Sequence, residues 1–256
     1  MLLLICSLLV LIKLINYDGE CHNGISDSVS GINDLDFRKD YLIILSLCLL
    51  PWPLIAAGIY LESNMWVTFF FYHWLLLFPF AIWKRSYWSG DIKFPSLKVI
   101  ALVLLAAVLT GFLALCIYDA SGKLIVDAGA VKTVLMRLKY DENLLVPLIV
   151  YFVIVNPFLE EIFWRGSVQN LVLEHFENRP LLGLSFTAIA FGAWHYLVLR
   201  VLLEPGASEL FVFGVVLVGF LLGFIYRKTS NLMVSVLVHS LVFDLSVVLI
   251  LLKVVL

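Results

Sequence analysis

Charged residues are scarce in this 256-residue sequence: they make up 14% of the chain, against 62% for hydrophobic residues. A soluble domain typically carries about 25% charged residues, so this composition excludes an ordinary soluble protein. The formal net charge is only −2 and no basic stripe with interleaved aromatics is present, so no nucleic-acid partner is expected. We therefore expect the lipid bilayer to surround most of the chain.

Several motifs are missing as well. The four cysteines are scattered and none stands in a CxxC spacing, so neither a zinc ribbon nor a disulfide framework is indicated. An HExxH helix, an internal repeat and a low-complexity tract are also absent. The apolar segments are too long, and alternate too little, to be strands of a membrane β-barrel.

Long apolar runs are what the sequence has in abundance. A helix needs about 20 mostly apolar residues to cross the hydrocarbon layer, and eight runs approach that length. They are residues 1–16, 41–61, 65–83, 97–118, 145–164, 181–202, 209–226 and 232–255. No small-residue cleavage pattern follows the first run, so we interpret it as a span rather than a signal peptide. The predicted fold is all-α, a polytopic membrane helical bundle of about eight transmembrane helices.

The distribution of Lys and Arg predicts the orientation of this bundle. Positive residues gather on cytoplasmic loops, and most of them follow the first, third, fifth and seventh spans, Arg165 included. Both termini are therefore expected on the non-cytoplasmic side. Because the polar residues with catalytic potential follow residue 150, we interpret residues 1–144 as variable helices and loops. Residues 145–256 are interpreted as the catalytic core, and both parts as one integrated membrane domain.

The fifth run contains two adjacent carboxylates, Glu160 and Glu161, followed by Arg165. Glu161 and Arg165 are four residues apart, the spacing at which a carboxylate and a cation meet on one helix face. Glu160 points about 100° away and has no evident local partner. Ionisable groups at bilayer depth are costly and usually functional. The alternative is a juxtamembrane charge cluster at the cytoplasmic end of the span, which would only anchor the helix.

Two later runs each contain a histidine. His195 stands one turn after Phe191 in the sixth run, and His239 is followed by Asp244 in the last run. A single membrane histidine is as often a packing residue as a functional one. A polar contact between His239 and Asp244 that only fixes helix packing would explain the polar residues of the last run. Three ionisable clusters on three helices favour a shared catalytic site.

Two other histidines are interpreted as less informative. His73 lies in the aromatic run 69–74, which is typical of an interfacial belt or a packing surface. His175 lies among Glu174 and Glu177 and is interpreted as part of a solvated surface.

With these clusters the chain resembles the CPBP family of intramembrane proteases, which includes type II CAAX prenyl endopeptidases and bacteriocin-processing or Abi-like proteins. The EExxxR and FxxxH motifs of that family stand here as Glu160, Glu161 and Arg165, and as Phe191 and His195. The resemblance covers roughly residues 145–246. It implies an intramembrane endopeptidase that cleaves a membrane-anchored peptide or protein, such as a CAAX-like, leader or sorting-tail peptide.

One position departs from the family pattern. The family usually has Asn four residues after the last histidine, and this sequence has Phe243 there. Asp244 follows one place later. A residue five positions after His239 is rotated about 140° from it on a regular helix. Asp244 therefore reaches the usual site only if the turn is locally wider or the helix is rotated differently.

The resemblance also implies a mechanism. Glu160 would act as general base on a water held jointly with His195, while Glu161 and Arg165 tune Glu160. His239 would donate to the developing oxyanion. No cofactor is favoured, and the rival is a zinc ion held by Glu160, His195 and His239.

Helix geometry raises a difficulty for this site. At 1.5 Å per residue, Glu160 lies about 8 Å from Arg165, whereas His195 lies about 22 Å from Pro180. If both spans begin at one membrane surface, the two side chains do not meet. The sixth span must then protrude from the membrane, or residues 166–179 must fold back beneath the bundle.

Two functions of other classes stay open. A proton-coupled carrier would also place Glu and His inside membrane helices, but it predicts paired broken helices and repeats. A non-catalytic immunity or scaffold protein is favoured by Phe243 and opposed by the intact Glu160 and His195. The compact, multi-pass integral chain fits a prokaryotic cytoplasmic membrane.

Overall fold

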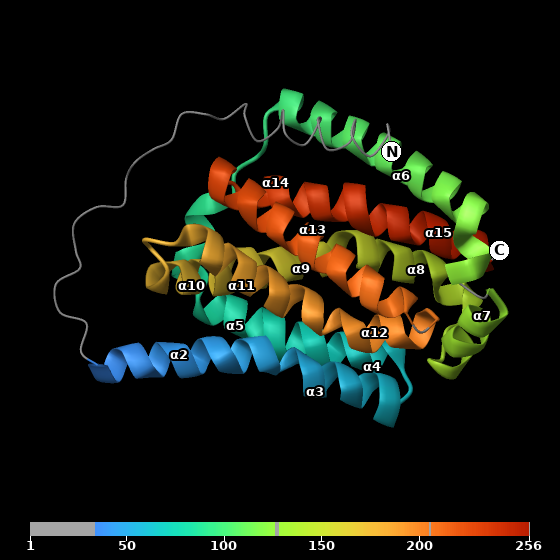
Figure 1. The fold of residues 1–256 in the computed structure, drawn as a ribbon, viewed down its shortest axis with the longest axis horizontal. Helices are drawn as coiled ribbons and strands as arrows, with labels where there is room; N and C mark the ends of the chain where they lie inside the picture. Colours follow the sequence, from blue (N-terminus) through green and yellow to red (C-terminus); the bar gives the residue numbers. More distant parts are fainter. Residues whose placement is uncertain (1–33, 126–127, 205, 256) are drawn as a thin grey trace.

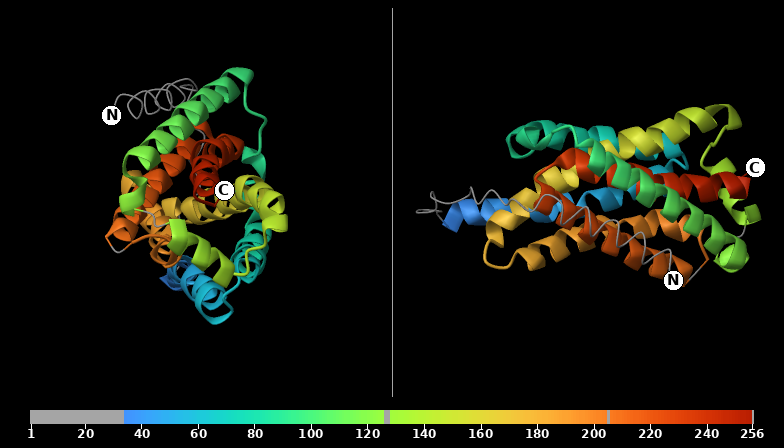
Figure 2. Two further views of the ribbon diagram at one scale, coloured as in Figure 1. Left: turned by 90° about the vertical axis from the view of Figure 1, so that its right-hand side faces the viewer. Right: turned by 90° about the horizontal axis from the view of Figure 1, so that it is seen from above.

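The computed structural model describes residues 34–125, 128–204 and 206–255, and the regular elements within these ranges are helical. Seven helical segments are long and apolar enough to cross a membrane. They run lengthwise together in one bundle (Figure 1, Figure 2). The all-α, multi-pass prediction is confirmed, and the predicted first span, residues 1–16, lies outside the described residues.

Three of the seven spans, Met65–Trp83, Leu145–His175 and Leu232–Val254, consist of α-helical pieces joined by π-helical pieces, whose turns are wider. The pieces before residue 96 are α2 (Asp34–Leu49), α3 (Pro51–Ala56), η1 (Ala57–Leu61), α4 (Met65–Phe69), η2 (Phe70–Leu77) and α5 (Phe78–Trp83), with 3₁₀ turns η3 (Arg85–Tyr87) and η4 (Ser89–Asp91). The central pieces are α6 (Leu97–Ile125), α7 (Ala128–Arg137), the 3₁₀ turn η5 (Glu142–Leu144), α8 (Leu145–Val150), η6 (Tyr151–Val155), α9 (Asn156–Glu161), η7 (Ile162–Gln169) and α10 (Asn170–His175). The last pieces are α11 (Pro180–Ala193), α12 (His195–Leu202), α13 (Ala207–Thr229), α14 (Leu232–Leu237), η8 (Val238–Asp244) and α15 (Leu245–Val255).

Residues that favour a helix start lie at the beginning of several spans, close to where the sequence predicted these spans to begin. The side chain of Asn64 accepts the backbone N–H groups of the first turn of α4, and Asn231 caps α14 in the same way. Pro180 stands at the first turn of α11, where its missing N–H costs nothing. These residues satisfy or remove donors that a helix start leaves unpaired.

The span that carries the paired carboxylates runs over Leu145–His175 instead of the predicted 145–164. Polar residues after Trp164 suggested an early end, but they have partners within the bundle. Gln169, for example, is buried and its Nε2 donates to the carbonyl of Gly223 on α13 at 3.1 Å. Because buried polar groups that are hydrogen-bonded cost little, the helix continues.

The segment between the third and fourth described spans is also more helical than predicted. The predicted apolar run ended at residue 118, yet α6 extends to Ile125 and α7 follows it. Val131 and Leu135 of α7 are buried, so this short helix packs its apolar side against the bundle end. Figure 1 shows α7 at the end of the bundle where α15 also finishes.

The longer fifth span removes the predicted mismatch in depth. Glu160 lies fifteen residues before the end of α10 at His175, and His195 lies fifteen residues after the start of α11 at Pro180. At 1.5 Å per residue, each is about 22 Å from the turn that joins the two helices. The predicted protrusion or fold-back was wrong because the helix simply continues past Arg165.

Glycines let α11 and α13 pack closely. A Cβ added to Gly192 would lie 2.4 Å from Cγ2 and 2.8 Å from the backbone nitrogen of Val216. A Cβ added to Gly219 would lie 2.8 Å from the ring of Phe191. Small residues allow membrane helices to approach this closely, and the contact fixes where α11 presents Phe191.

Gly192→Ala is therefore expected to destabilise the protein by about 1–3 kcal/mol, the usual cost of overpacking. Gly214→Ala on α13 is the matched control, because nothing lies within 4 Å of the added Cβ. The free energy of unfolding in detergent micelles compares the two variants. Equal values for both would contradict the close packing of α11 on α13.

Candidate functional site

The paired carboxylates and Arg165 are enclosed by the protein. Glu160, Glu161 and Arg165 are 1%, 0% and 2% exposed. Arg165 Nη1 donates to Glu161 Oε1 at 2.8 Å, and Nη2 donates to the carbonyl of Gly219 at 3.2 Å. The interpretation as a juxtamembrane anchor is wrong because these charges do not reach the surface. Arg165 is likewise not a loop residue and does not count toward the orientation of the bundle.

Glu160 points away from this ion pair. Its Oε2 lies 3.7 Å from Nε2 of His239 on η8, and the phenol of Tyr72 on η2 lies beside the carboxylate. Its Oε1 has no hydrogen-bond partner among the described residues. Because burying a polar atom without a partner is costly, this oxygen is unfavourable for folding.

His239 lies between three carboxylates. Its Nδ1 is 2.8 Å from Oε1 of Glu161, the oxygen that also accepts from Arg165. Its Nε2 is 3.5 Å from Oδ1 of Asp244 and 3.7 Å from Glu160. These last distances exceed the usual 2.7–3.2 Å of an N–H···O bond, so Nε2 faces two carboxylates at ion-pair distance without a short hydrogen bond to either.

The wide turn of η8 brings Asp244 to His239. Val238–Asp244 is π-helical, and a π-helix pairs residues five apart, so the 140° offset of a regular helix does not apply. Asn156 Nδ2 on α9 also donates to Asp244 Oδ2 at 3.2 Å. The structure therefore places Asp244, one position beyond Phe243, against the imidazole.

His195 joins the site through Phe191. Its Nδ1 lies 2.9 Å from the carbonyl oxygen of Phe191, and its ring stacks on Trp194 with centroids 3.6 Å apart. The Phe191 ring lies 4.3 Å below the Arg165 guanidinium and 6.0 Å from the His239 ring. His195 is near enough for the charges of Arg165 and His239 to act on it. It forms no ion pair with a carboxylate in the described part of the chain.

Two residues of η2 were missed by sequence reasoning. Tyr72 accepts a hydrogen bond from Trp164 Nε1 at 3.0 Å, and His73 is completely buried. Both lie in the aromatic run that was interpreted as an interfacial belt or a packing surface, and their burial agrees with the second. The signal that could have identified them is His73 itself, since an ionisable side chain at bilayer depth is by default a functional candidate.

The ligand set of the rival zinc mechanism does not form a metal-binding group. Across residues 34–125, 128–204 and 206–255, no three His, Cys, Asp or Glu side chains are arranged to hold a metal ion. Glu160 and His239 approach each other, whereas His195 is held by its own helix. Glu161 and Arg165 fill the other side of His239 with an ion pair.

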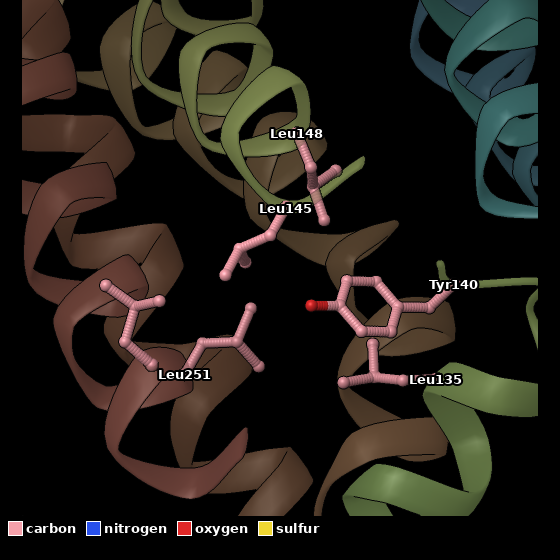
Figure 3. A pocket seen from close by; sticks show the side chains of 6 residues that line it. Leu135, Tyr140, Leu145, Leu148 and Leu251 are labelled. Carbon is pink, nitrogen blue, oxygen red and sulfur yellow. The ribbon is translucent and has the colours of Figure 1, made fainter. Parts of the chain in front are cut away.

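An apolar cavity lies apart from these residues. It opens where α7, α8 and α15 meet and is lined by leucines and Tyr140 (Figure 3). The lining residues are Leu135, Tyr140, Leu145, Leu148, Leu251 and Leu252. None of them belongs to the charged cluster, so this cavity is not the candidate active site.

Comparison with known families agrees with the motifs. Residues 142–243 match the family model described as type II CAAX prenyl endopeptidase Rce1-like. The matched segment contains both intact motifs and His239, and it ends one residue before Asp244. No curated protein and no solved structure matches the chain. The family match confirms the resemblance over these residues.

Proposed function

We propose that this integral membrane protein, whose residues 142–243 match the Rce1-like type II CAAX prenyl endopeptidases, hydrolyses a peptide bond of a membrane-anchored substrate. Glu160 carries the proposal: it is a buried carboxylate with one unpaired oxygen, 3.7 Å from His239. The adjacent Glu161 is already neutralised by Arg165. Neighbouring carboxylates in different surroundings take different roles, and Glu160 is the one left for proton transfer.

In the proposed reaction, Glu160 accepts a proton from a water molecule whose oxygen attacks the carbonyl carbon of the peptide bond. His195 helps to hold that water. When the C–N bond breaks, Glu160 passes the proton to the leaving amine nitrogen. One water is consumed, an acid and an amine are released, and Glu160 returns to its starting state.

His239 is proposed to stabilise the oxyanion that develops on the attacked carbonyl. Its Nε2 faces Glu160 and Asp244, and Nδ1 is fixed by Glu161. A donor aimed at the developing charge typically contributes about 2.7–4 kcal/mol to catalysis. Asp244 is proposed to orient this ring in place of the usual Asn, while Arg165 keeps Glu161 in position.

The finer features of the proposal concern substrate, metal and membrane. The substrate is proposed to be a CAAX-like, leader or sorting-tail peptide, and the membrane a prokaryotic cytoplasmic membrane. Water is proposed to be activated by glutamate and histidine without a metal. Support comes from the arrangement of the described residues, in which no three His, Cys, Asp or Glu side chains are placed to hold a metal ion.

Cleavage by the purified protein in liposomes tests the function. Prenylated CAAX peptides, leader peptides and membrane proteins with sorting tails are offered to the wild type, Glu160→Ala and His195→Ala. Product formed by the wild type alone is expected, and it should persist after exhaustive chelation. Normal cleavage by both variants would show that the site is wrong, and loss restored only by zinc would refute the metal-free mechanism. A wild type that cleaves nothing but moves protons or binds a partner would favour the carrier or scaffold.

A further inference from the structure

His73 is a buried ionisable residue that the proposed reaction does not use. It lies on η2, at 0% exposure, outside the segment that matches the protease family. Burying a polar ring without partners is costly. Its surroundings therefore indicate what keeps it inside the bundle.

One ring nitrogen of His73 has a clear partner. Nδ1 lies 3.1 Å from the hydroxyl of Tyr151 on η6, which is half-buried. The other nitrogen, Nε2, has no direct hydrogen bond among the described residues. The side chain of Asn156, on α9, also interacts with the His73 ring. His73 thus stands near a tyrosine and an amide of the span Leu145–His175, which also carries Glu160.

Asn156 links His73 to the candidate active site. Its Nδ2 donates to Asp244 at 3.2 Å, which leaves Oδ1 as an acceptor. One assignment of protons suits all three groups: Tyr151 donates to Nδ1 of His73, so the ring proton is on Nε2, and the oxygen of Asn156 is the acceptor of the side chain that interacts with this ring. Asn156 is then held with its amide nitrogen toward Asp244.

The far end of this chain of polar groups is His239. Oδ1 of Asp244 lies 3.5 Å from Nε2 of His239, the nitrogen that faces Glu160. A flip of the Asn156 amide would set its oxygen against the Asp244 carboxylate, two acceptors without a proton between them. Keeping the amide in one orientation therefore keeps Asp244, and the ring it faces, in one place.

We infer that His73 is a positioning residue of the site: it holds the amide of Asn156, and through it Asp244 and His239. The effect on catalysis rests on the proposed function, whereas the effect on His239 does not. Residues that orient catalytic groups typically contribute about 10- to 100-fold to activity. His73→Phe should reduce kcat by that factor and leave KM unchanged. Gln reaches the position of Nε2 and should restore the rate, whereas Asn is too short and should not.

The test that does not depend on cleavage uses ¹⁵N-histidine-labelled full-length protein in lipid nanodiscs. The ring-nitrogen resonances of His239 are assigned with His239→Gln and compared between variants. They are expected to shift in His73→Phe and to stay in place in His73→Gln, while those of His195 stay unchanged in both. His175→Phe is the matched control, because the Nδ1 of His175 lies 3.0 Å from the carbonyl oxygen of Leu171 on its own helix and away from this chain of contacts.

Unchanged His239 resonances in His73→Phe would overturn the inference. If that variant does not fold, His73→Asn and His73→Gln are compared instead. Equal His239 resonances in these two variants would overturn the inference, and a shift in His73→Asn alone would support it. A wild type that cleaves no substrate would refute the proposed protease while leaving this comparison intact. Shifts at His239 without any loss of kcat in an active enzyme would refute the role in catalysis.

Discussion

Glu160→Gln is expected to lower the rate of peptide cleavage by about 10²- to 10⁴-fold, the usual contribution of a general base. The amide has nearly the same shape but accepts no proton from water. The same variant is expected to be at least as stable as the wild type. Glu160 is 1% exposed and its Oε1 has no partner in the described part of the chain, so the carboxylate costs folding energy that the amide reduces.

The combination of lost activity and retained stability separates a catalytic role from a structural one, because functional residues are often unfavourable for stability. Cleavage rate and the free energy of unfolding in detergent are measured on the same preparations. Glu62→Gln is the matched control, since Glu62 is exposed, and both quantities should stay near the wild-type values. A variant at Glu160 that unfolds easily yet cleaves normally would show that Glu160 only supports the bundle.

Arg165→Met is expected to cause the largest loss of stability, about 3–5 kcal/mol, because it leaves the buried Glu161 without its cation. Arg165 is 2% exposed and pairs with Glu161 at 2.8 Å. The double variant Glu161→Gln with Arg165→Met removes both charges and should recover most of that loss. Arg200→Met is the control: Arg200 is exposed, and a surface substitution changes stability by about 0.5 kcal/mol or less.

Unfolding free energies of the wild type, Arg165→Met, Glu161→Gln and the double variant form a double-mutant cycle. If the two single losses simply add in the double variant, the ion pair is not an energetic unit. Because His239 Nδ1 also contacts the shared oxygen of Glu161, the recovery is expected to be large but incomplete.

The sequence predicted the elements that depend on local composition. Apolar runs of about 20 residues located the seven described spans, and the i,i+4 spacing predicted the Glu161–Arg165 pair. The burial of Glu160 and its separation from this pair follow from the same helix geometry. These features depend on residues close together in the sequence, so periodicity was enough to find them.

Features that depend on other helices were not predictable. The fifth span was ended too early because the partner of Gln169 is a backbone carbonyl on α13, which no side-chain pattern reveals. The position of Asp244 depends on a π-helical turn. From the sequence we could predict only that Asp244 reaches His239 if the turn is locally wider or the helix is rotated differently. The contacts of His73 were not predicted because its partners lie on Leu145–His175, two spans later in the sequence.

The two hydrogen bonds from η7 to α13 fix the position of the two helices along their length. Donors four residues apart, Arg165 and Gln169, meet carbonyls four residues apart, at Gly219 and Gly223. A shift of one helix by a single residue would break both hydrogen bonds. A Cβ added to Gly223 would also lie 2.4 Å from Gln169 Oε1, so a larger residue cannot take its place without a shift. Insertions or deletions of one residue in α13 should therefore misalign the charged cluster, although α13 itself supplies no predicted catalytic side chain.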